Sequence, residues 1–209
     1  MIISMWHGEA AAVERARTMA PGPERHRLVA ALLTGPLRDE APEWLLRAAI
    51  GRGLVIAGPD VGAARVALAH PSCPPGLRSV VVHRATDAQL AALGRRGCPP
   101  VLLEALIEEL DHRVQHQRTE PGAALTLLRD PDLHEALFAA ALERLRRNPP
   151  WPVSPATLRL MWGGILRVQS ARHAEIRRWA ENTPSAGDVR RLLAASRTPC
   201  GQAAGPPSD

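Results

Sequence analysis

The chain has 209 residues, of which 45% are hydrophobic, and a formal net charge of +5. All 26 basic side chains are Arg, because the sequence contains no Lys, and Tyr is absent as well. These absences exclude a Schiff-base lysine, the lysine of a phosphate-binding P-loop and a tyrosine nucleophile. Much of the apolar content is Ala and Leu, which favour helices over strands, so the composition predicts an all-α fold.

The first twenty residues carry Glu9 and Glu14 among their Arg residues and contain no continuous apolar stretch. This pattern is not that of a signal peptide. No window of the chain approaches the roughly 20 apolar residues that a membrane-spanning helix needs. We therefore expect a soluble cytoplasmic chain without a membrane partner.

A proline-containing motif recurs along the chain. Cys73-Pro74-Pro75 is followed 25 residues later by Cys98-Pro99-Pro100, and a short Ala/Leu segment precedes each copy. Proline suits the first turn of a helix because the N–H that it lacks is not needed there. Looser copies begin at Ala41, Leu133 and Ser154. Each of the five units is expected to contain a short helix, a turn and a longer helix that begins at the motif.

Two runs of β-branched residues allow an alternative α/β fold. Residues 54–57 precede Gly58 and Pro59, and residues 79–82 precede Thr86, so each run has the pattern of a buried strand that leads into a helix. We favour the all-α fold because residues 80–82 occupy the long-helix position of the second unit.

The units resemble the variant leucine-rich repeats, which are bacterial relatives of HEAT-like helical repeats and also pair a short helix with a longer one. The resemblance covers about residues 28–160 and is strongest around Cys73 and Cys98. It implies a short right-handed helical-repeat (HEAT-like) array over residues 1–150. We expect basic amphipathic helices at 151–197 to pack on this array, a long one among them closing it, followed by a disordered tail at 198–209. Some variant-repeat proteins carry a cysteine cluster for an iron-sulfur centre; this chain has none, so we expect no cofactor.

The cysteines stand at wide spacing and in an odd number, which favours neither a disulfide framework nor a four-cysteine metal site. Cys73 and Cys98 each stand at a helix start, where the helix dipole can lower a thiol pKa. Ala41 and Leu133 occupy the same position in other units. We therefore expect packed, structural thiols at these two positions. The third cysteine is Cys200.

Glu108, His112 and His116 are spaced by four residues on one expected helix, and a His pair at that spacing can chelate a metal. A zinc-protease motif needs Glu directly after its first His, where this chain has Arg113. The many charged neighbours favour a solvated surface. These three residues are therefore only weak metal candidates, and we expect no metal.

The excess of positive charge lies near the C-terminus. Residues 1–150 hold 18 Arg against 17 acidic residues, whereas residues 151–209 hold eight Arg against four. On a helical wheel of residues 155–181, an apolar arc lies opposite the basic residues Arg159, Arg167, Arg177 and Arg178. The arc contains Leu158, Met161, Trp162, Ile165, Val168, Ile176 and Trp179. The candidate polyanion- or partner-binding residues, here called the C-terminal arginine set, are Arg144, Arg146, Arg147, Arg159, Arg167, Arg177, Arg178, Arg190 and Arg191.

No convergent set of catalytic residues is evident, so we expect a non-enzymatic protein-interaction module or scaffold with an extended concave surface. Four further arginines near the ends of the early long helices are expected to reach an acidic partner: Arg47, Arg52, Arg78 and Arg84. One alternative is nucleic-acid binding, in which the C-terminal arginine set contacts phosphates. A more remote alternative is a helical-repeat DNA glycosylase, although no carboxylate is plainly paired with Trp162 and Trp179.

Overall fold

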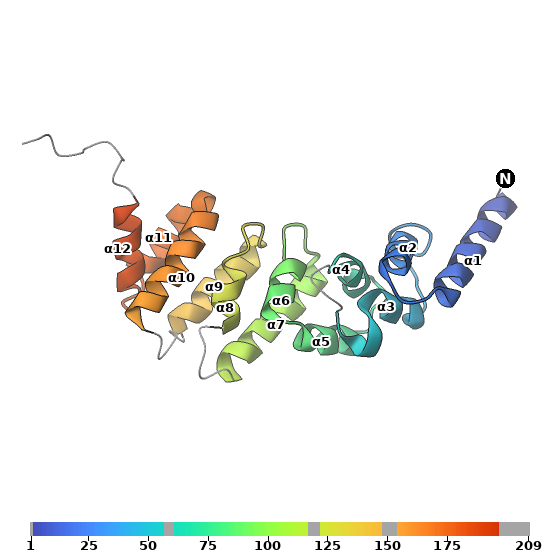
Figure 1. The fold of residues 1–209 in the computed structure, drawn as a ribbon, viewed down its shortest axis with the longest axis horizontal. Helices are drawn as coiled ribbons and strands as arrows, with labels where there is room; N and C mark the ends of the chain where they lie inside the picture. Colours follow the sequence, from blue (N-terminus) through green and yellow to red (C-terminus); the bar gives the residue numbers. More distant parts are fainter. Residues whose placement is uncertain (1, 57–60, 117–121, 148–153, 197–209) are drawn as a thin grey trace, which may run out of the picture.

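The computed structural model describes residues 2–56, 61–116, 122–147 and 154–196, with side chains from Gly8 onward. Cys200, Trp151 and the expected tail at 198–209 lie outside these ranges. Within them the chain forms α-helices, two short 3-10 helices and no strand, so the expectation of an all-α fold is confirmed (Figure 1). The α-helices are α1 (Ile2–Thr18), α2 (Pro23–Thr34), α3 (Glu43–Ile50), α4 (Gly62–Ala69), α5 (Pro75–Arg84), α6 (Asp87–Leu93), α7 (Pro100–His116), α8 (Gly122–Leu127), α9 (Glu135–Arg147), α10 (Pro155–Val168), α11 (His173–Glu181) and α12 (Gly187–Ala195).

The α/β alternative does not describe this chain in the part that the structure covers. Residues 79–82 lie inside α5. Leu54 ends the 3-10 helix Arg52–Leu54, and Val55, which follows it, has extended backbone angles. β-branched residues are accommodated in α5 because Val81 and Val82 are buried on its inner side.

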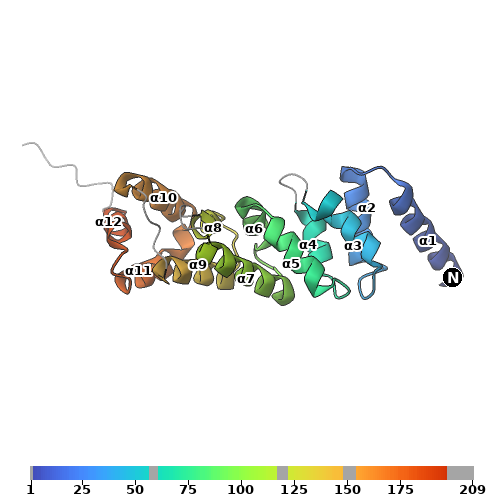
Figure 2. The ribbon, with the colours of Figure 1, turned by 90° about the horizontal axis from the view of Figure 1, so that it is seen from below.

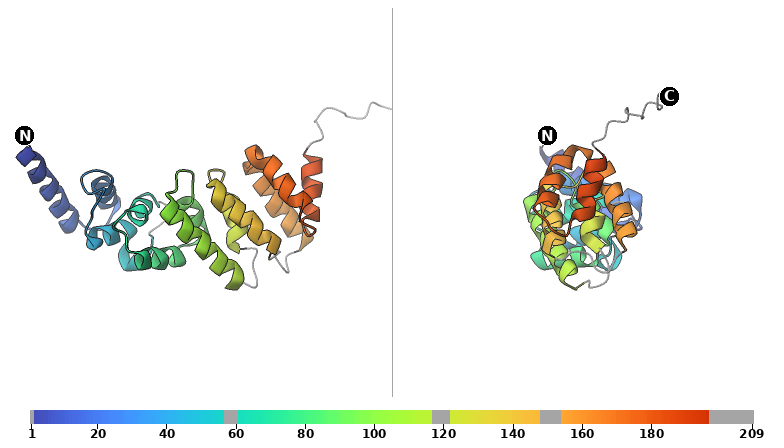
Figure 3. Two further views of the ribbon diagram at one scale, coloured as in Figure 1. Left: turned by 180° about the vertical axis from the view of Figure 1, so that it is seen from behind. Right: turned by 90° about the vertical axis from the view of Figure 1, so that its left-hand side faces the viewer.

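The helices form an elongated array with α1 at one end and α12 at the other (Figure 1, Figure 2). α2, α3 and α4 contact one another near the N-terminal end. Further along, α5 contacts α7 and α7 contacts α9, while α6 contacts α8. Viewed along its length, the array has a narrow outline (Figure 3). Each helix therefore packs mainly on helices that are close to it in the sequence.

Five helices begin where the proline-containing motif places them: α3, α5, α7, α9 and α10. The turns before three of them share a hydrogen bond, in which the N–H of the motif's first residue donates to the carbonyl oxygen three residues earlier. The bonds join Cys73 to His70 at 2.9 Å, Cys98 to Arg95 at 3.0 Å and Leu133 to Asp130 at 3.2 Å. Equivalent residues in these units thus adopt equivalent turns.

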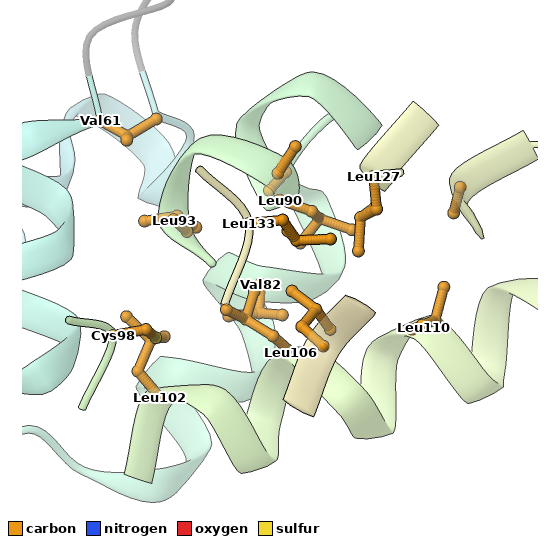
Figure 4. Packing of buried hydrophobic residues seen from close by; sticks show 14 of the residues in the cluster. Val61, Val82, Leu90, Leu93, Cys98, Leu102, Leu106, Leu110, Leu127 and Leu133 are labelled. Carbon is orange, nitrogen blue, oxygen red and sulfur yellow. The ribbon is translucent and has the colours of Figure 1, made fainter. Parts of the chain in front are cut away.

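The apolar core runs along the array between the helices. Figure 4 shows its centre, where Leu90 and Leu93 of α6 pack near Leu102 and Leu106 of α7 and near Leu133 from the following turn. All five side chains are buried. Burial of each such side chain contributes roughly 1.5–3 kcal/mol, so packing rather than helix propensity holds the short helices in place.

The C-terminal segment forms three α-helices within residues 154–196, so the continuous helix that the wheel of residues 155–181 assumed is interrupted. The chain leaves α10 at Gln169 and forms a 3-10 turn (Ser170–Arg172) before α11, and α12 follows as a third helix. Gln169 is buried, and its side-chain amide donates to the carbonyl oxygens of Leu128 at 3.0 Å and Asp130 at 2.7 Å. These distant partners stabilise the break in the helix. Val168, which the helical wheel placed in the apolar arc, is exposed as a result.

Candidate partner-binding site

Most members of the C-terminal arginine set are paired with other groups of the chain. Arg144 on α9 forms a bidentate ion pair with Asp111 on α7. Arg146 and Arg147 both donate to Glu143, at 2.6 Å and 2.9 Å. These hydrogen bonds, that of Arg146 first, lower the pKa of Glu143 to about 2.

The second half of the set is similarly engaged. Arg159 of α10 and Arg191 of α12 both approach Asp188, whose pKa is lowered chiefly by the hydrogen bond from Arg191. Arg190 donates to the carbonyl oxygens of Ala180 at 2.8 Å and Thr183 at 3.0 Å, which cap the end of α11. The side chains of the remaining members have no hydrogen-bond or ion-pair partner among the described residues. They are Arg167, Arg177 and Arg178.

Arg78 cannot reach a partner, contrary to the expectation from sequence. Its side chain is buried and donates to the carbonyl oxygens of Leu68 at 2.8 Å and Cys73 at 3.3 Å. The sequence pattern correctly predicted that Arg78 lies on a helix. It did not show that the turn between α4 and α5 covers the Arg78 side chain. The guanidinium instead satisfies backbone acceptors at the end of α4.

The other three early arginines are accessible to different degrees. Arg84 is exposed and donates to the carbonyl oxygen of Gly53 at 2.7 Å. Arg47 forms an ion pair with Glu43 at 2.6 Å, in which both side chains are about half exposed. Arg52 is exposed and has no side-chain partner among the described residues.

The weak metal candidates lie on the outside of α7. His112 and His116 have ring centroids 4.2 Å apart, and the sequence did not indicate that His83 on α5 lies next to them, 5.3 Å from His112. His83 donates to Glu109 at 3.1 Å, whereas Glu108 is exposed. Among the residues with described positions, no group of three His, Cys, Asp or Glu side chains has a geometry that could hold a metal ion.

Cys73 and Cys98 are both buried and unpaired. Their thiols donate to the carbonyl oxygens of Pro74 at 3.8 Å and Pro99 at 3.7 Å, which are equivalent contacts in the two units. Burial raises the pKa of each thiol, and Arg78 near Cys73 and Arg65 near Cys98 only partly oppose this effect. The expectation of packed, structural thiols is therefore confirmed.

The two C-terminal tryptophans pack against each other inside the array. Their rings stack with centroids 5.2 Å apart, and Trp162 is buried. Trp179 donates from Nε1 to the carbonyl oxygen of Leu142 at 2.9 Å. The pair therefore joins α10, α11 and α9 and does not present a stacking surface to solvent.

A groove of about 1060 Å³ lies between α2, α3 and α4. The apolar part of its lining comes from all three helices and includes Ala30, Trp44, Ala48, Ala63 and Val66. Each of these side chains is partly exposed. The groove therefore offers apolar surface that the fold leaves accessible near the N-terminal end of the array.

The charged part of this lining is basic: it contains four arginines and no carboxylate among the described residues. Arg25 donates to the carbonyl oxygen of Ala16 at 2.8 Å, and Arg47 pairs with Glu43. Arg27 and Arg52 are exposed and have no side-chain partner in the described ranges. Of these four arginines, Arg47 and Arg52 were candidates from the sequence. Arg27 and Trp44 were not recognised from the sequence, because only the packing of the helices brings them into the same groove.

Comparisons with family models, with curated proteins and with solved structures found no match to this chain. Within the described residues, no helix is both long enough and apolar enough to cross a membrane.

Proposed function

We propose that this chain is a non-enzymatic helical-repeat module, of the HEAT-like or variant leucine-rich type, that binds another protein, preferably an acidic one. The observation that carries the proposal is the elongated array in which each helix packs on near neighbours in the sequence. Helical-repeat proteins have this contact pattern, and they use their long lateral surfaces for binding. The equivalent turns at Cys73, Cys98 and Leu133 support the assignment to repeats.

A reducing, cytoplasmic location fits the two buried, unpaired cysteines, because disulfides are rare in that compartment. This location is part of the same proposal. Fractionation of the native host's cells tests it.

The test is photo-crosslinking in a lysate of the native host. Amine-reactive reagents have no lysine to attack in this chain, so a photoreactive residue replaces Val80 on α5 or Leu160 on α10, both of which are exposed. We expect one or a few proteins to crosslink in proportion to the added chain and to remain crosslinked after nuclease treatment. Crosslinks no stronger than those of the heat-unfolded chain would overturn the proposal.

The alternative function is binding of nucleic-acid phosphate backbones. The side chains of Arg167, Arg177 and Arg178 favour it because they lack partners in the described part of the chain. Their contacts would release counterions, so the affinity would fall linearly with the logarithm of the salt concentration. Reversing two charges, in Arg167→Glu/Arg178→Glu, is then expected to reduce that slope by about 2. Undetectable binding of DNA and RNA at about 50 mM salt, where screening is weak, rejects this alternative.

The glycosylase alternative receives no support from the tryptophans, which stack on each other inside the array. An assay for excision of damaged bases tests it directly.

A further inference from the structure

We propose that the groove between α2, α3 and α4 binds an acidic segment of the partner protein that carries a bulky apolar side chain. This inference rests on the proposed function and names the class of partner segment and its binding site.

The charge of the groove selects acidic segments. Arg27 on α2 and Arg52 after α3 are exposed, are part of the lining and have no side-chain partner among the described residues. A guanidinium presents donors in a planar fork that matches a carboxylate, so both side chains can form bidentate pairs with a partner. Arg47 is held only by an exposed ion pair with Glu43, and such pairs stabilise by about 1 kcal/mol or less, so a partner carboxylate can displace Glu43.

The apolar part of the lining selects the second feature of the segment. Trp44 is half-buried and lines the groove together with the small side chains of Ala48 on α3 and Ala63 on α4. Small residues beside an aromatic ring leave room for a large side chain of the partner. Buried aromatic contacts of this kind carry much of the energy of protein interfaces, whereas rim charges set specificity and the rate of association.

The size of the groove fits a peptide segment better than an ion or small metabolite. Its volume of about 1060 Å³ slightly exceeds the roughly 300–1,000 Å³ typical of small-molecule pockets. A nucleic-acid site needs a basic stripe that follows many phosphates. The lining of this groove instead combines arginines with apolar side chains, which favours a protein segment over a nucleic acid.

The experiment measures fluorescence anisotropy with a labelled pool of acidic peptides of about 12 residues, which span roughly 40 Å when extended. Asp, Glu, Ser and Gly are mixed around one central Leu. The test variant is Arg27→Glu/Arg52→Glu, and its matched control is Arg96→Glu/Arg129→Glu, which lies outside the lining of the groove and makes the same change in net charge. Arg27, Arg52, Arg96 and Arg129 are all exposed, and the described residues offer their side chains no partner, so both variants are expected to fold, which circular dichroism verifies.

We expect the test variant to weaken binding by at least about tenfold and the control by less than about twofold, because screened charges act over about 10 Å. Replacing the central Leu by Ser is expected to weaken binding to the wild type. Equal losses in both variants, or no loss in the test variant, would overturn the inference. An oligothymidine that displaces the peptide from the wild type but not from the test variant would assign the groove to nucleic acid instead.

Failure of this inference is distinguishable from failure of the proposed function. If the test variant still crosslinks the same partner through Val80 as strongly as the wild type, the groove is not the binding site, while the interaction module stands. If the peptide binds as expected but no host protein crosslinks to either the wild type or the test variant, the proposed function fails.

Discussion

The guanidinium of Arg78 donates from Nε to the carbonyl oxygen of Leu68 at 2.8 Å, across the turn that joins α4 to α5. Other arginines make the same kind of contact with backbone carbonyl oxygens at turns and helix ends. They are Arg25, Arg65, Arg84, Arg113, Arg172 and Arg190. Because an arginine fork can bind several acceptors at once, it suits the carbonyl groups that helix ends leave unpaired. Much of the arginine in this chain therefore supports the fold.

Replacing Arg78 by Met tests this role. Met has a similar length and fills the buried site, but the carbonyl groups of Leu68 and Cys73 lose their donors. A buried acceptor left unsatisfied costs about 1–3 kcal/mol, so we expect the free energy of unfolding to fall by about 2 kcal/mol. Urea unfolding followed by circular dichroism measures the change.

The control for Arg78→Met is Arg38→Met, since the one side-chain partner of Arg38 among the described residues is the adjacent Asp39 and both side chains are largely exposed. Its expected effect is below about 0.5 kcal/mol. Equal unfolding free energies for the two variants would show that Arg78 does not stabilise the turn.

Arg113 joins three elements of the array. It pairs with Glu109 at 2.7 Å and with Asp87 at 2.6 Å, and it donates to carbonyl oxygens at the end of α5, among them that of Ala85 at 2.6 Å. Removing one partner of a buried pair leaves an uncompensated charge. We therefore expect Arg113→Ala to destabilise the protein by about 3 kcal/mol.

A double-mutant cycle separates the ion pair from the other contacts of Arg113. Glu109→Gln removes the buried charge, so the double variant Arg113→Ala/Glu109→Gln is expected to be more stable than the sum of the two single changes predicts, by about 1 kcal/mol or more. Strict additivity, measured by the same unfolding experiment, would contradict the coupling.

The sequence predicted the helices well, because their starts are marked locally. Proline at the first turn of α5, α7 and α10 is a signal carried by the residue itself. The break after α10 was not predictable in the same way. Gln169 is stabilised there by the carbonyl oxygens of Leu128 and Asp130, which lie about 40 positions earlier in the chain.

The candidate site was predicted only in part for the same reason. Arg47 and Arg52 stood out because they lie at the end of an expected helix. Arg27 and Trp44 line the same groove only because α2 packs on α3 and α4. No local sequence pattern predicts that packing. Conversely, Arg144 appeared free in the sequence, although the fold brings Asp111 to it from another helix.

The buried thiols give a prediction about reactivity. In a Cys200→Ser background, Cys73 and Cys98 are the only cysteines that remain. Burial raises both thiol pKa values, and the thiolate is the reactive form, so we expect a disulfide reagent such as DTNB to react with the native protein only as fast as it opens. Both thiols are expected to react at once in denaturant. Rapid reaction of either thiol in the native state would instead indicate an accessible, activated cysteine.

The pairing of Glu143 with Arg146 and Arg147 gives a prediction about pH. The pKa of Glu143 is lowered from its ordinary value near 4.5 to about 2, first by the hydrogen bond from Arg146. A lowered pKa in the folded state means that the interaction stabilises the protein fully above the unfolded-state value, near 4.5. The stabilisation is lost as the pH falls through about 2.

Carbon NMR of the Glu143 carboxyl group measures that titration. We expect a midpoint near 2 in the wild type and a midpoint close to 4.5 in Arg146→Ala/Arg147→Ala. A wild-type midpoint near 4.5 would show that the two arginines do not hold Glu143 in solution. They would then be accessible to phosphates, and the nucleic-acid alternative would gain two contacts.

With the pairing intact, Glu143 competes with any polyanion at this end of α9, so Glu143→Gln is expected to strengthen polyanion binding if that alternative holds.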